Sequence, residues 1–84
     1  MDYQQLGALI GSAWRDNHPN ADPKTSIVDI TKGLDLRHTP MQQVAVFSIA
    51  LQRTMKGQCY GCGTTHEVGR NEHGVFCCEV CVGQ

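Results

Sequence analysis

The cysteines constrain this chain more than any other feature, because all five fall within 23 residues near its C-terminal end. Four of them form two Cys-x-x-Cys pairs, Cys59 with Cys62 and Cys78 with Cys81, and fifteen residues separate the pairs. Two residues between cysteines allow one tight turn to direct both sulfurs at a single ion, and this spacing is typical of structural zinc sites. We therefore predict a Zn²⁺ ion held by these four thiolates.

The segment between the two pairs predicts a β-hairpin. The polar residues Arg70-Asn71-Glu72-His73-Gly74 are typical of a turn that joins two short strands. With such a hairpin between its cysteine pairs, the segment 58–82 resembles a zinc ribbon. The resemblance implies a structural zinc ion but no single function, because ribbons serve in many proteins. A treble-clef finger is the neighbouring arrangement. It begins a helix at its second cysteine pair, and only Val82-Gly83-Gln84 follow that pair here.

The fifth cysteine is expected to be structural. Cys78 gives the normal spacing to Cys81, so Cys77 is interpreted as a small buried residue of the second strand. The alternative is a role for Cys77 as an exchangeable ligand or a redox-sensitive thiol. His66 and His73 would replace a sulfur only if Cys78 were not used.

Residues 1–57 are predicted to form about three helices. Asp2 is expected to cap the first helix, with Gln5 completing a capping box. Asn17-His18-Pro19-Asn20 is expected to end it. Apolar residues at helical spacing mark one face of this segment: Tyr3, Leu6, Leu9, Ile10, Ala13 and Trp14.

Local signals also mark the ends of the next two helices. Asp22-Pro23 predicts the start of a short second helix, which Gly33 ends. Thr39-Pro40 predicts the start of the third helix, with Thr39 as its cap and Gln42 completing a second capping box. Gly57 is expected to stop this helix after Lys56.

Two glycines, Gly7 and Gly11, lie four residues apart in the first helix. Each weakens a helix by about 1 kcal/mol relative to alanine. One interpretation is a groove in which another helix approaches closely, and the other is a pair of tolerated, exposed positions.

The third helix predicts a contact with another protein. Its centre, residues 44–51, is apolar nearly all the way round. Two other helices, one of them short, can hardly cover every side of it, and an exposed apolar strip marks a partner surface. The predicted contact positions are Val46 and Ala50, on the side away from Phe47. The partner is a second copy in a symmetric homodimer or another protein, and the alternative is complete internal burial.

The charge distribution disfavours nucleic acid. Residues 1–57 sum to +1 and residues 58–84 to −2 at pH 7. Four thiolates on one zinc ion add about −2, so the C-terminal part reaches about −4. Such a surface repels phosphates, which a nucleic-acid-binding module must neutralise. Enzymatic activity is not expected, because four cysteines leave zinc no open position for water and no nucleophile pattern is present.

The expected fold is a small α+β unit: a helical bundle over 1–57 followed by a zinc-ribbon-like hairpin over 58–84. The expected function is that of a non-enzymatic, zinc-binding adaptor or regulator that acts by binding protein. One alternative is a zinc-containing transcription regulator that binds DNA or RNA. The other is a rubredoxin-like electron carrier, which the helices and the missing proline of the second cysteine turn disfavour.

The expected location is the cytoplasm. No apolar run approaches the roughly 18 residues that a membrane-spanning helix needs. The segment Met1-Asp2-Tyr3-Gln4-Gln5 also lacks the basic stretch of a secretory signal.

Overall fold

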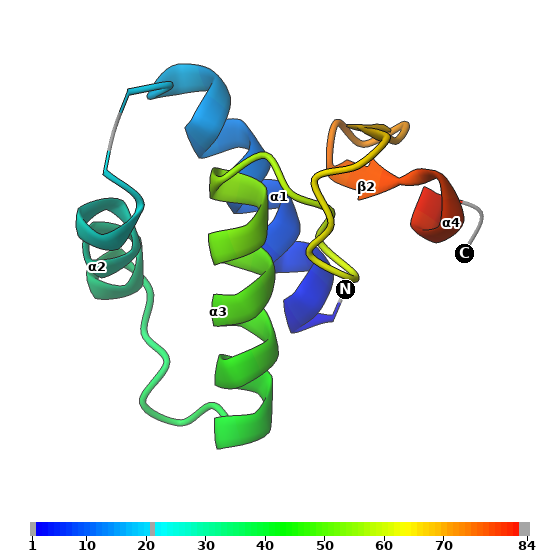
Figure 1. Ribbon diagram of the computed structural model, residues 1–84. Helices are drawn as coiled ribbons and strands as arrows, with labels where there is room; N and C mark the ends of the chain where they lie inside the picture. The colour runs from blue at the N-terminus through cyan, green and yellow to red at the C-terminus, as the bar shows by residue number, and fades with distance from the viewer. Residues whose placement is uncertain (1, 21, 83–84) are drawn as a thin grey trace.

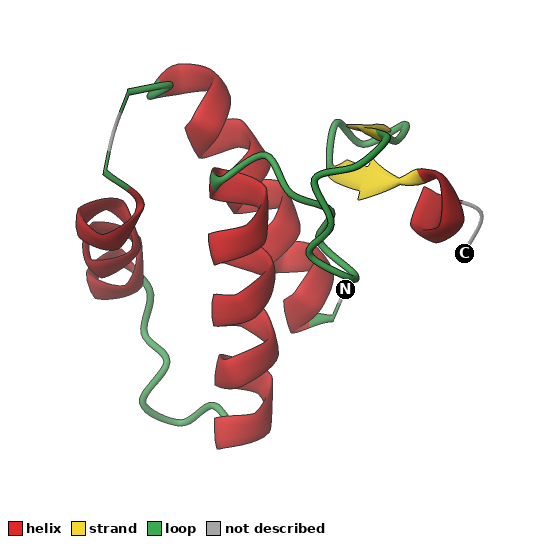
Figure 2. Ribbon diagram, viewed as in Figure 1, coloured by secondary structure: helices red, strands yellow, loops and turns green. Residues whose placement is uncertain are grey.

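The computed structural model describes residues 2–20 and 22–82, which form a small α+β fold and confirm the predicted class (Figures 1 and 2). Helix α3 lies beside α1, with α2 on one side of this pair and the C-terminal hairpin on the other (Figure 1). The elements in chain order are α1 (Tyr3–Asn17), α2 (Pro23–Gly33), α3 (Met41–Met55), β1 (Val68–Arg70), β2 (Phe76–Cys78) and α4 (Glu79–Val82).

The first helix begins and ends where the sequence predicts. The side chain of Asp2 accepts a hydrogen bond from the backbone N–H of Gln5 at 2.7 Å, so Asp2 caps α1. Helix α1 ends at Asn17. Asp22 is the N-cap residue of α2, and Gly33 is its last residue.

The predicted cap of the third helix is wrong. The N-cap residue is Pro40, and no side chain caps this end. Pro40 has an extended backbone, with φ −54° and ψ 142°, so the first helical residue is Met41 rather than Pro40. The hydroxyl of Thr39 lies 3.4 Å from that of Tyr3 instead of reaching a helix N–H.

The other end of α3 is closed by a Schellman motif. Gly57 has a φ of +74°. Its N–H donates to the carbonyl of Thr54 at 3.1 Å, and the N–H of Gln58 donates to that of Arg53 at 2.8 Å. The predicted stop at Gly57 is therefore confirmed, and the chain turns there toward the cysteines.

Helices α1 and α3 are in close backbone contact at the two glycines. A Cβ atom on Gly7 would lie 2.4 Å from the carbonyl oxygen of Phe47, and one on Gly11 would lie 2.7 Å from that of Leu51. Both distances are far below van der Waals contact. The interpretation of Gly7 and Gly11 as a groove for another helix is thus confirmed.

The main apolar core lies on one stripe of α3, formed by Phe47, Leu51 and Met55. These residues are four apart, so they lie on one helix face. The half-buried residues that pack around them come from α1, α2 and the connection to α3: Tyr3, Leu6, Ile10, Trp14, Ile27, Ile30, Leu34 and Leu36.

Ala50 was predicted to lie on a partner surface, and this is wrong. It is only 1% exposed and packs in a second cluster with Ala8 of α1 and Val75 of the hairpin. The reason is that the hairpin docks on α1 and α3, so a third segment covers the side of α3 that two helices would leave open.

The remaining side of α3 is exposed, and Val46 lies on it at 40% exposure. Met41 is 87% and Ile49 is 47% exposed, and Ala45 is exposed as well. We call Met41, Ala45, Val46 and Ile49 the α3 strip. Met41, Ala45 and Ile49 follow one another at intervals of four residues, and Val46 precedes Ile49 by three, so the four residues share one side of the helix.

No helix within residues 2–20 and 22–82 is both long and apolar enough to cross a membrane.

Candidate metal centre

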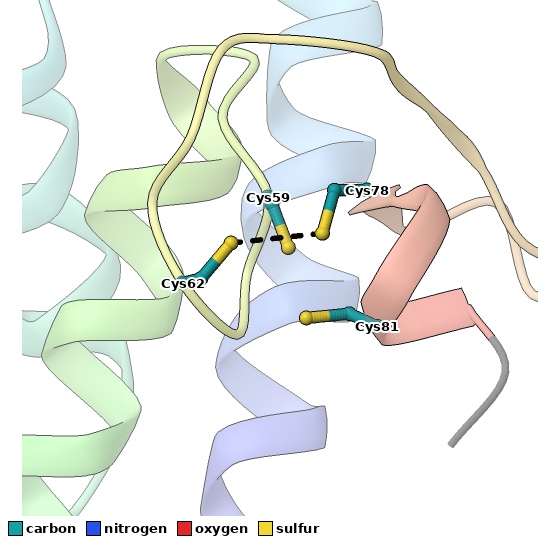
Figure 3. A group of neighbouring side chains, drawn as sticks. All are labelled: Cys59, Cys62, Cys78 and Cys81. Carbon is teal, nitrogen blue, oxygen red and sulfur yellow. Dashed lines mark hydrogen bonds between the residues drawn. The ribbon is translucent and has the colours of Figure 1, made fainter.

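The sulfur atoms of Cys59, Cys62, Cys78 and Cys81 all lie within 4.8 Å of one another. In Figure 3 the four side chains point toward a common centre from two separate segments. The first pair comes from the turn after α3, and the second comes from the end of β2 and from α4. The predicted grouping is therefore confirmed, and we call residues 58–82 the finger.

A tight turn holds the first pair. The N–H of Gly63 donates to the carbonyl of Cys59 at 2.9 Å, and the N–H of Cys59 donates to that of Thr64 at 3.0 Å. Gly63 has a φ of +78°, a conformation that suits glycine. At Gly61 a Cβ atom would lie 2.9 Å from the sulfur of Cys81, so glycine leaves the space in which the two pairs meet.

The hairpin carries the second pair to the first. Strands β1 and β2 are antiparallel, with Val68 opposite Cys78 and Arg70 opposite Phe76. The turn between them is held by Asn71, whose side-chain oxygen accepts from the N–H groups of His73 and Val75 at 2.9 and 3.0 Å. The backbone N–H of Tyr60 donates to the carbonyl of Phe76 at 3.0 Å and so joins the cysteine turn to β2.

The second pair spans the junction of β2 and a short helix. Cys78 ends β2, and α4 begins at the next residue, Glu79, so Cys81 lies in the helix itself. The sequence was expected to leave too little chain for such a helix, and this is wrong because the helix starts between the two cysteines. The structure supports a four-cysteine metal site, whereas the zinc-ribbon identity is not confirmed.

The thiols have strongly different acidities. Burial raises the pKa of Cys59, but the backbone N–H groups of Cys78, Cys62 and Gly61 outweigh burial and lower this pKa to about 6. The hydrogen bond with Cys59 and burial raise the pKa of Cys81 to about 12. Without a cation, these shifts favour the thiolate form of Cys59 and the neutral thiol of Cys81, and binding of a metal ion to Cys81 would release its proton.

The donor set fits zinc. Four sulfur ligands are a common structural set for zinc, and zinc–sulfur bonds of about 2.3 Å in a tetrahedron place the sulfurs about 3.8 Å apart. Cys62 and Cys78 have their sulfurs 3.6 Å apart, and the whole group spans no more than 4.8 Å.

The other candidate ligands are outside the group. Cys77 is buried in β2 and is only 3% exposed, as expected for a structural residue. Burial raises the pKa of its thiol. His66 and His73 are exposed and lie near the carboxylates of Glu67 and Glu72, with nitrogen–oxygen distances of 3.8 and 3.4 Å.

Several residues that position the finger were not identified from the sequence. Arg53, at the end of α3, donates to the carbonyls of Tyr60 and Gly61 at 3.3 and 3.0 Å and so binds the first cysteine turn. The hydroxyl of Ser12 accepts from the N–H of Phe76 at 3.3 Å. The Ser12 contact joins residues 64 positions apart, and the Arg53 contacts span seven and eight positions across the turn after α3, so neither follows a helix or strand spacing.

A paired arginine forms a further link between the finger and α1. Arg70 in β1 donates through two nitrogens to both carboxylate oxygens of Asp16, one of them at 2.7 Å. The guanidinium of Arg70 also lies 4.3 Å from the ring centre of Phe76. The hydrogen bond from Arg70 lowers the pKa of Asp16. The one arginine of the finger is therefore engaged within the fold.

Comparison of the chain with protein-family models, with curated proteins and with solved structures found no match.

Proposed function

We propose that the four-cysteine group binds one structural Zn²⁺ ion per chain and joins the two halves of the finger. The observation that carries this proposal is the approach of four sulfurs to within 4.8 Å from two segments of the chain. Bound zinc supplies a fixed cross-link in place of an extended apolar core. Structural zinc can contribute roughly 10–16 kcal/mol of folding free energy, as much as the whole net stability of a typical domain, about 5–15 kcal/mol.

Native mass spectrometry and metal analysis of the full chain test the site. We expect one zinc ion per chain, lost in Cys62→Ser and kept in Cys77→Ser. The matched pair separates a ligand from a neighbouring buried cysteine. Loss of zinc in Cys77→Ser but not in Cys78→Ser would overturn the ligand assignment. An iron-containing protein with the visible absorption of an iron–thiolate site would favour the rubredoxin-like alternative.

We further propose that the protein is a non-enzymatic adaptor or regulator that acts through the α3 strip. An apolar strip on an otherwise packed helix is the surface type used for protein contacts. Between His38 and Arg53 the chain carries no charged side chain. Two copies of α3 can therefore pair about a two-fold axis without bringing like charges together, which favours a symmetric homodimer as the first case to test.

Sedimentation equilibrium of the full, metal-loaded chain tests the homodimer. We expect a dimer for the wild type and a monomer for Ile49→Glu, because a buried, unpaired carboxylate is costly at an apolar interface. Val28→Glu is the matched control, since Val28 is also exposed, at 49%, but lies on α2. A monomeric wild type, or equal effects of the two variants, would overturn the homodimer.

The charges of the finger support a protein partner over nucleic acid. Glu67, Glu72 and Glu79 are exposed, whereas Arg70 is paired with Asp16. A transcription regulator that touches DNA or RNA would have to use the helical part. A gel shift with random duplex DNA tests that alternative, and salt-sensitive binding would favour it. Five free cysteines suit a reducing compartment, so we propose the cytoplasm.

A further inference from the structure

The four ligand cysteines differ in their exposure to solvent. Cys59 and Cys78 are buried, Cys81 is half-buried, and Cys62 is exposed. A surface hollow of about 360 Å³ lies against the centre, and Cys62, Cys78, Cys81 and Val80 are among the residues that line it. Cys62 is the most exposed of the three cysteines that line this hollow, and Cys59 is not part of it.

The sulfur of Cys62 also has a nearby partner for a disulfide. The sulfur atoms of Cys62 and Cys78 are 3.6 Å apart, and they come from the two different halves of the finger (Figure 3). A disulfide bond is about 2.05 Å long, so these atoms need to approach by only about 1.6 Å. The sulfur of Cys59 is engaged differently, since it accepts a hydrogen bond from the N–H of Gly61 at 3.4 Å.

We propose that the metal centre is a redox switch in which hydrogen peroxide converts Cys62 and Cys78 to a disulfide and the site releases its metal. The inference rests on the proposed zinc site.

Two steps account for the atoms and electrons. First, the thiolate of Cys62 attacks one peroxide oxygen, the O–O bond breaks, and hydroxide leaves with the electron pair. The sulfur becomes a sulfenic acid, oxidised by two electrons, while the peroxide is reduced. Second, the thiolate of Cys78 attacks the sulfur of Cys62, the S–O bond breaks, and a second hydroxide leaves. Solvent protons convert both hydroxides to water.

The product keeps the finger closed by a different link. The site has lost two of its four ligands, whereas the new bond still joins the first cysteine turn to the end of β2. Cys77 takes no part, because it is buried and is not among the residues that line this hollow. A thiol reductant and zinc together should restore the original state.

The test uses the full zinc-loaded chain and hydrogen peroxide. Zinc content is first measured without peroxide, so a chain that holds no zinc refutes the proposed site independently of the switch. Peroxide is then added from one to ten equivalents, and released zinc is followed with a chromogenic chelator. The expected result is release of one zinc ion per chain, reversed by dithiothreitol and added zinc. Cys77→Ser should behave in the same way.

The disulfide is mapped by mass spectrometry after alkylation of the remaining thiols. Chymotrypsin cleaves after Tyr60 and so separates Cys59 from Cys62. A glutamate-specific protease cleaves after Glu79 and so separates Cys78 from Cys81. The expected product is a cross-linked peptide that contains Cys62 and Cys78, with alkylated Cys59 and Cys81 elsewhere. The same cross-linked peptide in Cys77→Ser would show that Cys78, and not the neighbouring Cys77, forms the disulfide.

Three outcomes would overturn the switch. Zinc retained at ten equivalents of peroxide would show that the site resists this oxidant. Release accompanied by disulfides within each Cys-x-x-Cys pair would show that the 3.6 Å contact does not direct the reaction. Conversion of Cys62 to sulfinic acid without a disulfide would show that Cys78 does not resolve the sulfenic acid.

Discussion

Gly7 faces the carbonyl of Phe47 so closely that a Cβ atom at Gly7 would lie 2.4 Å from the carbonyl oxygen. The contact is between two backbones, so neither side can move aside as a flexible side chain would. We predict that Gly7→Ala destabilises the protein by about 1–3 kcal/mol, the usual effect of overpacking. Helix propensity alone predicts the opposite sign, a gain of about 1 kcal/mol. Chemical denaturation followed by circular dichroism measures the difference.

Gly33 provides the control for this prediction. It is the last residue of α2, and a Cβ atom there meets nothing within 4 Å. Gly33→Ala should therefore be neutral or stabilising, by no more than about 1 kcal/mol. A stabilised Gly7→Ala would show that the α1–α3 contact is looser than described.

The helix ends and the grouping of the four cysteines were predictable because their signals are local. Asp2, Asp22 and Gly57 act through residues within five positions of themselves, and the cysteine pairs are recognised by their own spacing. The same local rule failed at Thr39, where the extended backbone of Pro40 displaced the helix start by one residue.

The docking of the finger was not predictable in the same way. The burial of Ala50 depends on Val75, which is 25 positions away in the sequence, and on Ala8 of α1. Arg53 stands in the last turn of α3, where the helix dipole alone favours a cation, yet its guanidinium binds the carbonyls of the first cysteine turn. Such contacts depend on how the folded helices and the hairpin pack together, so the residue spacing within one segment does not predict them.

Removal of the metal should separate the two parts of the molecule. A metal chelator is expected to unfold the finger, because its strands are only three residues long and its cross-link is lost. The helical signal in circular dichroism should largely remain, and so should the fluorescence of Trp14, the one tryptophan, which packs against the α3 core.

Amide hydrogen exchange distinguishes the outcomes of this experiment. Increased exchange in residues 58–82 with continued protection of α1 and α3 is the expected pattern. Unchanged protection of the finger would refute its dependence on metal. Loss of protection throughout would show that the helices also require the finger.

The pair of Arg70 and Asp16 is expected to fix the finger on α1. Arg70 lowers the pKa of Asp16, so the stabilisation is present at pH values above the ordinary aspartate pKa and is lost as the pH falls through the lowered value. At pH 7 it is fully present. We predict a small loss of stability in Asp16→Asn and in Arg70→Gln, and less than additive loss in the double variant.

Salt is the second variable in this test. Both side chains are partly exposed, so added salt should screen the attraction and reduce the coupling between the two substitutions. Thermal unfolding of the wild type, the two single variants and the double variant, each at low and high salt, measures this coupling. Additive losses at both salt concentrations would mean that the pair does not couple the finger to α1.

Ala50 and Val46 lie four residues apart on α3, yet a charged side chain should disrupt the fold at Ala50 and leave the fold intact at Val46. Ala50 is 1% exposed and touches both α1 and the finger, so Ala50→Glu buries an unpaired carboxylate and overfills a small site. We expect it to prevent folding or to detach the finger, seen as loss of bound zinc together with loss of cooperative unfolding. Val46 is 40% exposed, so Val46→Glu should leave the zinc content and the circular dichroism spectrum unchanged and act only on association. Unfolding by Val46→Glu would show that the α3 strip is part of the core. A folded, zinc-loaded Ala50→Glu would show instead that the finger does not pack on α3 as described.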